Sequence, residues 1–325
     1  MQRSRVINQV IATSQELQRR ARVQTARFGQ RRAAPVVHAA NDEPTAVVSS
    51  QPAPGVLEIR LTGGTRRNVL GRLTLERIES LVEFAPAETR VILLSADGPD
   101  FCAGYDLFEA ARDGAESLLA HESNLAPLRR SSCPIIAALH GNVIGGGLEL
   151  ALAADVRLAS RDVRLAIPAS ALGLVYSEAG TRLLVDELGE STTRAMLLGG
   201  KSLDANEALA SGLVTDLVAL EDLDARALEL ATRIASWSPV ATAGNRRVLD
   251  VVAGRVTDDT AALRLASFAP HSALASSIER FVNRRAAAPP PVPTYRRIAH
   301  DSWQLATARA NHLLSRRAAR LNPTR

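Results

Sequence analysis

The residues whose types and spacing could do chemistry lie in one stretch, residues 141–155, which reads G-N-V-I-G-G-G-L-E-L-A-L-A-A-D. Three consecutive glycines, Gly145 to Gly147, open an apolar run that suits a buried helix, with one carboxylate, Glu149, in its first turn. Glycine lets a ligand approach the backbone closely. The first N–H groups of a helix lack intrahelical partners and carry the positive end of the helix dipole, so they stabilise an oxyanion. A carboxylate beside such donors is a candidate acid or base.

The same stretch also has a purely structural interpretation. Glycine-rich turns precede many helices, and a glutamate in the first turn is favoured by the helix dipole alone. The stretch is not a P-loop, because no Gly-Lys-Ser/Thr follows, and it lacks the G-x-G-x-x-G spacing of a dinucleotide site. The choice between the two interpretations depends on the rest of the chain.

Length and composition are those of a globular protein. The chain has 325 residues, of which 46% are hydrophobic. It has no uninterrupted apolar run of about 18 residues, so we expect no transmembrane helix and no membrane partner. Two cysteines suggest no disulfide framework and fit a reducing cytoplasm. The net charge of +5 comes almost wholly from arginine, since Lys201 is the only lysine, which indicates a compositional bias of the source. Arginine binds phosphate in a planar fork, so acidic ligands fit this composition.

The two ends of the chain differ from its centre. Residues 1–34 combine eight arginines with one glutamate and place apolar residues at helical spacing, which predicts a basic amphipathic extension. Such a segment is typical of an organelle transit peptide, an interaction arm or a flexible tail. Residues 35–54 carry the Pro, Ser and Asn of a linker, so the globular part should begin near Gly55. The proline run at 289–291 ends the preceding helix, and residues 289–325 predict a linker and a basic C-terminal helix.

Residues 55–200 predict an α/β core. Apolar patterns predict strands at 56–61, 90–95, 134–139, 156–159 and 163–167, and helices at 73–84, 109–130, 178–189 and 191–198. Because β and α units alternate, most of the strands should be parallel. Residues 201–288 are expected to be the helical part of the same fold, with helices at 204–211, 221–236, 239–253 and 259–285.

Two segments resemble a known family. F-C-A-G-Y-D-L (101–107) and P-I-I-A-A-L-H-G-N-V-I-G-G-G-L-E-L-A-L-A-A-D (134–155) resemble, in order and spacing, the paired signatures of the crotonase superfamily, the enoyl-CoA hydratase/isomerase family. The similarity continues at 203–214 and 238–241 and covers about residues 55–288. It implies a crotonase-like ββα superhelical core, a helical C-terminal trimerisation region, and assembly as a homotrimer or hexamer.

The resemblance also implies roles for individual residues. In this family an acyl thioester lies between two backbone N–H groups that bind its carbonyl oxygen as an enolate forms, and the matching donors are Tyr105 and Gly146. Glu149 matches the family's first catalytic glutamate, a general acid/base. The implied binding residues for the substrate and its CoA are Ala103, Asp106, Leu107 and Gly145, with Arg66 and Arg67 where the family often places a basic residue for phosphates.

Other chemistry is not expected. The resemblance implies no cofactor other than coenzyme A as part of the substrate. Nothing in the sequence has the spacing of metal ligands, so we expect no metal site. His140, at the end of a predicted buried strand, is expected to be a structural histidine rather than a base.

The chain departs from the family pattern at Ala169. Hydratases and many isomerases carry a second glutamate after a proline, whereas here an alanine follows Pro168, and its methyl group cannot transfer a proton. Glu149 could then serve alone as acid and base, or another carboxylate could reach the site, the candidates being Glu109, Glu122 and Glu178. Alternatively, P-A-S-A-L-G-L-V-Y is similar to the segment of malonyl-type CoA decarboxylases in which a tyrosine, here Tyr176, faces the substrate carboxylate.

Three hypotheses for the function follow. The first is an acyl-CoA enzyme that works through an enolate, an enoyl-CoA hydratase or isomerase with Glu149 as acid/base. The second is a malonyl-type decarboxylase or C–C lyase that uses Tyr176, because decarboxylation needs enolate stabilisation and no base. The third is a non-catalytic member that binds RNA or another partner through its basic tails. The intact glycines and the lack of interleaved aromatics in the tails argue against nucleic acid. The acyl group, and its presentation by CoA or a carrier protein, stay open.

Overall fold

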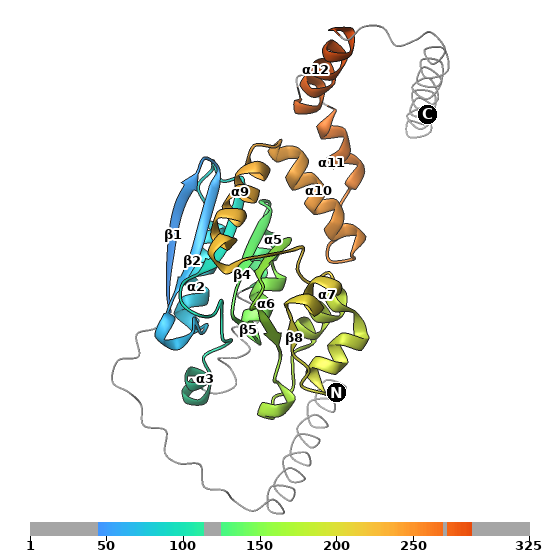
Figure 1. Ribbon diagram of the computed structural model, residues 1–325. Helices are drawn as coiled ribbons and strands as arrows, with labels where there is room; N and C mark the ends of the chain where they lie inside the picture. The colour runs from blue at the N-terminus through green and yellow to red at the C-terminus, as the bar shows by residue number, and fades with distance from the viewer. Residues whose placement is uncertain (1–44, 114–124, 269–271, 288–325) are drawn as a thin grey trace, which may run out of the picture. The chain divides into compact units, whose positions relative to one another are not determined.

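The computed structural model describes residues 45–113, 125–268 and 272–287 of the 325-residue chain (Figure 1). The basic extension predicted over 1–34 and the linker and helix predicted over 289–325 lie outside these residues. Within them, strands and helices alternate and are followed by a series of helices, so the predicted α/β class is confirmed. No helix in this part of the chain is long and apolar enough to cross a membrane.

Within the described ranges the strands form two sheets. The large sheet has the order β1 (Ala46–Ala53), β2 (Val56–Thr62), β3 (Val91–Ala96), β4 (Ile135–Leu139), β6 (Val156–Ser160) and β9 (Asp216–Val218). The small sheet has the order β5 (Asn142–Ile144), β7 (Arg164–Ala166) and β8 (Leu203–Asp204). All neighbouring strands are parallel except for the pairs β1–β2 and β7–β8. The prediction of mostly parallel strands is therefore confirmed.

The helices follow the predicted order with two differences. They are α2 (Arg72–Glu83), α3 (Leu107–Asp113), α5 (Ala126–Arg130), α6 (Gly146–Leu152), α7 (Glu178–Leu197), α8 (Ala205–Ala210), α9 (Leu223–Ala235), α10 (Pro239–Val252), α11 (Thr260–Ser267) and α12 (Ala273–Ala287), with 3-10 turns at Gly64–Arg66, Ser170–Leu172 and Leu220–Asp222. The helical stretch predicted over 109–130, with a loop at Gly114 and at 121–124, begins earlier with α3 at Leu107 and has a separate helix start at Ala126, while residues 114–124 lie outside the described residues. The helical segment predicted near 259–285 is interrupted, because the hydroxyl of Ser272 accepts the N–H of Ala275 and starts a separate helix, α12.

The linker predicted over 35–54 is wrong in its second half, because Ala46–Ala53 forms β1 at the edge of the large sheet. Its side chains are mostly exposed, so the strand lacks the alternation of apolar and polar residues that the sequence analysis used. The backbone ladder to β2 holds it instead, with Val47 opposite Leu61 and Ser49 opposite Ile59. A polar edge strand and a linker have similar compositions.

The large sheet has a core on each face, because its buried strands alternate their side chains with a period of two. On β3, Ile92 and Leu94 join the larger core with α2 and α6, whereas Val91 and Leu93 join the smaller one. The helix α9 covers the smaller core with one apolar stripe, consisting of Leu223, Ala227, Ala231 and Ile234. The predicted strands that read as continuous apolar runs are therefore buried on both faces.

Two arginines, Arg157, which is buried, and Arg246, which is half-buried, hold later helices to this framework. Arg157 of β6 donates to the carbonyl oxygens of Ala154 and Leu213 and pairs with Glu187 of α7 at 2.8 Å. Arg246 of α10 binds Asp155 through Nε at 2.9 Å and donates to carbonyl oxygens at the end of α5. A guanidinium group has five donors, so one side chain can satisfy several helix-end carbonyls at once.

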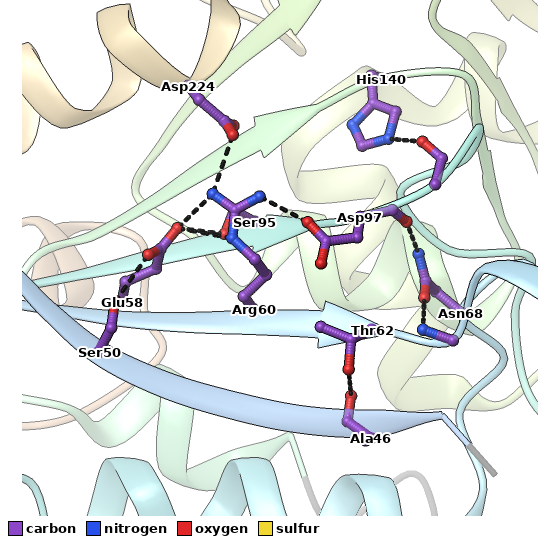
Figure 2. Close-up of polar contacts among 12 residues, drawn as sticks. Ala46, Ser50, Glu58, Arg60, Thr62, Asn68, Ser95, Asp97, His140 and Asp224 are labelled. Atoms are coloured by element: carbon purple, nitrogen blue, oxygen red, sulfur yellow. Dashed lines mark hydrogen bonds and ion pairs between the residues drawn. The ribbon is translucent and has the colours of Figure 1, made fainter. Parts of the chain in front are cut away.

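A polar network fastens α9 to the strands (Figure 2). Arg60 of β2 donates to Glu58 Oε1 at 2.6 Å and to Asp224 Oδ2 of α9 at 2.9 Å. Glu58 also accepts hydrogen bonds from the hydroxyl groups of Ser50 and Ser95. Burial alone would raise the pKa of Glu58, but the bonds from Ser95, Ser50 and Arg60 together hold its pKa below the ordinary value of 4.5.

Replacing Glu58 by glutamine should destabilise the fold in a pH-dependent way. A carboxyl group whose folded-state pKa is lowered stabilises the fold above its unfolded-state pKa, and this contribution is lost as the pH falls through the folded-state pKa. We expect Glu58→Gln to lower the free energy of unfolding by about 1–3 kcal/mol at neutral pH, measured by urea titration. The difference from wild type should shrink as the pH falls below about 4.5.

The matched control is Glu76→Gln, which removes only the exposed i,i+4 partner of Arg72. It should change the free energy of unfolding by less than about 0.5 kcal/mol. If Glu58→Gln lowered the free energy of unfolding by the same amount at neutral pH and below about pH 4.5, the role of the ionised carboxylate would be contradicted.

Candidate active site

The two sequence signatures lie side by side. The N–H of Cys102 donates to the carbonyl oxygen of Asn142 (3.1 Å). The N–H of Ile144 in turn donates to the carbonyl oxygen of Cys102 (2.9 Å). Cys102 thereby pairs with Val143 as a parallel bridge on β5. Because the segments run in the same direction, Tyr105, which lies three residues after Cys102 in the first signature, comes to lie beside the start of α6.

Two polar side chains that the sequence analysis did not select support this arrangement. Asp100 Oδ1 accepts the backbone N–H (2.7 Å) and the side-chain amide (2.6 Å) of Asn142. Asn68 accepts the N–H of Gly63 (2.6 Å) and donates to the carbonyl oxygens of Asp97 and Asp100 (2.7 and 2.8 Å), as Figure 2 shows in part. Asn68 has a φ of 56°, which asparagine tolerates better than most residues, so its place in the turn T-G-G-T-R-R-N was the available signal.

The helix α6 begins where the sequence predicts an oxyanion site. Gly145 caps it with a φ of 53°, and its carbonyl oxygen accepts the N–H groups of Leu148 and Glu149. Gly146 is the first helical residue, and an α-helix offers its N–H no internal partner. Glu149 lies in the first turn and is only 4% exposed. The positive end of the helix dipole and a buried carboxylate therefore meet here.

Tyr105 lies against this helix end. It forms a parallel bridge with Leu70, whose N–H donates to Gly104 (2.8 Å) and whose carbonyl oxygen accepts the N–H of Asp106 (3.0 Å). In such a bridge the N–H of Tyr105 itself points away from Leu70. A Cβ atom at Gly146 would lie 2.7 Å from ring atoms of Tyr105, so the ring packs directly on the glycine. The two residues that the resemblance named as oxyanion donors are neighbours.

The hydroxyl group of Tyr105 makes a contact that the sequence analysis missed. It donates a hydrogen bond to Oε2 of Glu149 at 2.8 Å. The two residues are 44 positions apart, so no local pattern could signal the contact. The side chain of Tyr105 is consequently part of the site, as well as its backbone.

Tyr176 and the other oxygen of the same carboxylate both lie close to Gly180. A Cβ atom at Gly180 would lie 2.8 Å from Glu149 Oε1 and 2.8 Å from Tyr176 Cε1, so the glycine leaves room for both side chains. Ser177 caps α7 by accepting the N–H of Gly180 at 3.0 Å, which fixes this first turn. The structure thus brings Tyr105, Glu149 and Tyr176 together.

The structure describes three of the four positions considered for a second carboxylate. Ala169 is buried in the larger core. Glu109 accepts the N–H of Arg72 at the start of α2 (3.1 and 3.2 Å), so it caps that helix. Glu178 is exposed in the first turn of α7, where the dipole favours an acidic residue. Glu122 lies outside the described residues.

The predicted CoA-binding residues gather around the first signature. Arg66 pairs with Asp106 at 2.8 Å, and Arg67 Nε lies 3.4 Å from Asp100 Oδ2. Both guanidinium groups therefore have carboxylate partners, although the Arg67 side chain is 61% exposed. The other predicted residues are Ala103, whose N–H donates to Arg67 (2.9 Å), Leu107 at the start of α3, and Gly145 at the cap of α6. Their role in binding CoA stays a prediction.

Two further side chains near the signatures are structural. Burial raises the pKa of the Cys102 thiol to about 12, so it stays protonated and is a poor nucleophile. His140 is buried, and its Nε2 lies 3.0 Å from the carbonyl oxygen of Gly98 (Figure 2), which fits the structural role expected for it. Among the residues placed by the structure, no cluster of three or more His, Cys, Asp or Glu could hold a metal ion.

The sequence profile of the enoyl-CoA hydratase/isomerase family matches residues 52–287, which is more than half of the chain. The chain belongs to this family. The 2,3-dehydroadipyl-CoA hydratase of Escherichia coli (strain K12) is 33% identical over 198 residues, 60% of this chain and 78% of that protein. The carnitinyl-CoA dehydratase of Proteus mirabilis (strain HI4320) is also 33% identical over 198 residues, 59% of this chain and 76% of that protein.

Solved structures of the family share the fold. The enoyl-CoA hydratase of Bacillus anthracis matches with a TM-score of 0.66 at 26% identity, covering 74% of this chain and 96% of that one. The crotonase-like fold implied by the sequence signatures is therefore confirmed. As a member of the enoyl-CoA hydratase/isomerase family, the protein is an enzyme.

In this hydratase/isomerase family member, two adjacent glycines should respond differently to alanine. A Cβ atom at Gly147 would lie 2.6 Å from the buried carbonyl oxygen of Cys102, so Gly147→Ala should lower the free energy of unfolding by about 1–3 kcal/mol. A Cβ atom at Gly146 meets the Tyr105 ring, which can rotate away. Gly146→Ala should keep near-wild-type stability but lose about 10²-fold in turnover, because the site geometry shifts.

Urea titration and an enoyl-CoA turnover assay on the same preparations test both expectations. Full turnover by Gly146→Ala would contradict the placement of the reaction at this helix end.

Proposed function

We propose that the protein acts on acyl-CoA thioesters through an enolate stabilised at the N-terminus of α6, as an enoyl-CoA hydratase or isomerase. The position of Glu149 carries this proposal. It is a buried carboxylate in the first turn of α6, hydrogen-bonded to Tyr105 and next to the two residues proposed as oxyanion donors, Tyr105 and Gly146. A base and an oxyanion site at one helix end are what proton transfer beside a thioester carbonyl requires.

In the proposed reaction the thioester carbonyl oxygen accepts hydrogen bonds from the backbone N–H groups of Tyr105 and Gly146. For hydration, Glu149 takes a proton from water while the water oxygen bonds to the β-carbon, and the electrons of the double bond move to the carbonyl oxygen. The protonated Glu149 then delivers the proton to the α-carbon as the enolate collapses. Loss of one oxyanion donor typically costs about 2.7–4 kcal/mol, so the helix end should supply much of the rate enhancement.

Isomerisation uses the same groups without water. Glu149 removes a proton from one carbon of the acyl chain, the enolate forms on the same donors, and the carboxyl group returns the proton to another carbon. One carboxylate can do both steps, which fits a site where Ala169 stands in place of a second glutamate. No resident cofactor takes part in either reaction, since CoA arrives with the substrate.

The substrate class is supported by the relatives and by the first signature. The relatives described above are named as acting on dehydroadipyl-CoA, carnitinyl-CoA and enoyl-CoA. Arg67, whose exposed guanidinium group pairs with Asp100 and whose carbonyl oxygen accepts the N–H of Ala103, would contact the CoA phosphates, and Arg66 would hold Asp106 in place. A guanidinium group suits phosphate because it donates in a planar fork.

One observation favours a second candidate, a malonyl-type decarboxylase or C–C lyase. The Tyr176 ring lies beside Glu149 Oε1 at Gly180 and could face a substrate carboxylate instead of supporting a proton transfer. In that reaction the bond between the α-carbon and the carboxylate breaks, CO2 leaves, and its electron pair forms the enolate. Solvent or a nearby acid then protonates the α-carbon.

Incubation with a panel of enoyl-CoA and malonyl-type CoA thioesters, with products read by mass, tests the proposal. A gain of water identifies a hydratase, rearrangement at unchanged mass an isomerase, and loss of CO2 a decarboxylase. We expect the wild type to hydrate or isomerise an enoyl-CoA, and Glu149→Gln to lose at least about 10²-fold in turnover, the usual scale for general acid/base catalysis. No product from any thioester, or full turnover by Glu149→Gln, would overturn it.

We also propose assembly as a homotrimer or hexamer. Large apolar side chains stay exposed on and before α10, at Trp237, Val240, Leu249 and Val252. Exposed apolar patches often mark protein interfaces. Light scattering should give a mass of three or six times 34.7 kDa, and a mass equal to that of one chain would contradict the proposal.

A further inference from the structure

The hydroxyl group of Tyr105 has no part in the mechanism above, which uses only the N–H of that residue. Yet this hydroxyl donates to Oε2 of Glu149 at 2.8 Å, and Glu149 is a buried residue that is only 4% exposed. A donated hydrogen bond of this length to a buried carboxylate is a strong, directional interaction. It acts on the one carboxyl group that the proposed reaction needs.

We propose that Tyr105 is a positioning residue for Glu149, whose hydroxyl holds Oε2 and leaves Oε1 as the oxygen that transfers protons. The inference rests on the proposed function, because it takes Glu149 as the acid/base. The two oxygens have different surroundings: Oε2 is bound to Tyr105, whereas Oε1 lies at Gly180 beside Tyr176. The carboxylate is thus fixed in one orientation between two elements of the fold.

The position of the hydroxyl group is set by backbone rather than by flexible side chains. The bridge to Leu70 fixes the backbone of Tyr105, and its ring packs on the Cα atom of Gly146. Gly146 in turn belongs to the same helix as Glu149. One residue therefore couples the two halves of the site, since its N–H is the proposed donor to the substrate oxygen and its hydroxyl is the donor to the base.

This contact compensates in part for the missing second glutamate. Burial disfavours the ionised form of a carboxyl group, whereas a hydrogen bond donated to that form favours it. Ala169 has no group that could hold a water molecule or orient Glu149, so the phenol supplies the orienting bond. The donated bond favours the ionised form of Glu149 without bringing a second negative charge into the site.

The titratable side chains that the structure places at the first turn of α6 are Tyr105, Tyr176 and Cys102. Burial raises the pKa of Cys102 to about 12, and phenols ordinarily ionise near pH 10. The acid limb of a pH–rate profile for kcat/KM therefore reports the ionisation of Glu149 in the free enzyme.

The test is the pH dependence of Tyr105→Phe on the enoyl-CoA substrate found in the panel. The acid limb of kcat/KM should move to higher pH by roughly one unit, because the bond that favours the ionised carboxylate is gone. The value of kcat should fall about tenfold or more near pH 6, with KM within about twofold of wild type, since the backbone donor remains. Thermal unfolding of the variant checks that the fold is retained.

Site-specific 3-fluorotyrosine at position 105 supplies a rescue and a graded test. It retains the ring and restores a hydroxyl that is a stronger donor, so the acid limb should return to the wild-type position or below it. Ser50→Ala is the control for loss of a hydroxyl that donates to a carboxylate, since the exposed Ser50 donates to Glu58 and not to Glu149. Its profile should equal that of the wild type.

The outcomes separate the two proposals. A Tyr105→Phe profile identical to the wild type, with Glu149→Gln inactive, overturns the positioning role and leaves the proposed function standing. A uniform loss at all pH values with a raised KM also overturns it, because that result indicates a substrate contact. An active Glu149→Gln variant removes the proposed function itself.

Discussion

The site depends on one close approach, that of the Tyr105 ring to the Cα atom of Gly146. A side chain at position 146 would displace the ring, so glycine is required for the ring to lie in this position. The approach also depends on the parallel pairing of Cys102 with β5 and of Tyr105 with Leu70, which fix the first signature on both sides. Through this contact a loop from one part of the chain and a helix from another form a single site.

The fold supports the contact because the elements behind it are buried. The strand β4 runs through the centre of the large sheet and delivers the chain directly to Gly141 and β5. At Gly141 the φ is 53°, and a Cβ atom would lie 2.0 Å from the carbonyl oxygen of Pro99, so only glycine permits this turn. Asp100 then binds the next residue, Asn142. The start of α6 is therefore positioned by the core of the sheet rather than by exposed loops.

Much of this architecture could be predicted from the sequence. The strands β2, β3, β4 and β6 have apolar patterns that directly reflect their burial, and the predicted break near residue 190 coincides with Gly189, which has a φ of 75° within α7. The edge strand β1 was missed because its stability comes from backbone pairing, which leaves no side-chain pattern. The separate start of α5 inside the helical stretch predicted over 109–130 was missed, because apolar periodicity does not show where a new helix begins.

Prediction of the site had a similar limit. The resemblance gave Tyr105, Gly146 and Glu149, and the structure brings them together. It could not give the bond from the Tyr105 hydroxyl to Glu149, because the two residues are far apart in the sequence. The role that the resemblance implied for Tyr105 also concerned only its backbone N–H. Asn68 was missed for the same reason: its partners lie about thirty residues away, and only the folded turn brings them within reach.

Because position 169 is an alanine and not a glutamate, the side chains near Glu149 differ from a pair of carboxylates. With Ala169 in the core, the described part of the chain places two tyrosines near Glu149. The Tyr105 hydroxyl is bonded to Oε2, and the Tyr176 ring lies close to Gly180, as Oε1 does. A phenol donates a hydrogen bond to a carboxylate, whereas a second carboxylate would repel it unless one of the two were protonated. The same three side chains are compatible with proton transfer by Glu149 and with recognition of a substrate carboxylate by Tyr176.

The most direct measurement of the central claim is a crystal structure of the protein with a saturated acyl-CoA thioester, which cannot be hydrated. The account predicts that the thioester carbonyl oxygen lies about 3 Å from the backbone nitrogens of both Tyr105 and Gly146. It also predicts that Glu149 Oε1 is closer than Oε2 to the α-carbon, with the Tyr105 hydroxyl still bound to Oε2. A thioester bound with its carbonyl oxygen away from these two nitrogens would contradict the account.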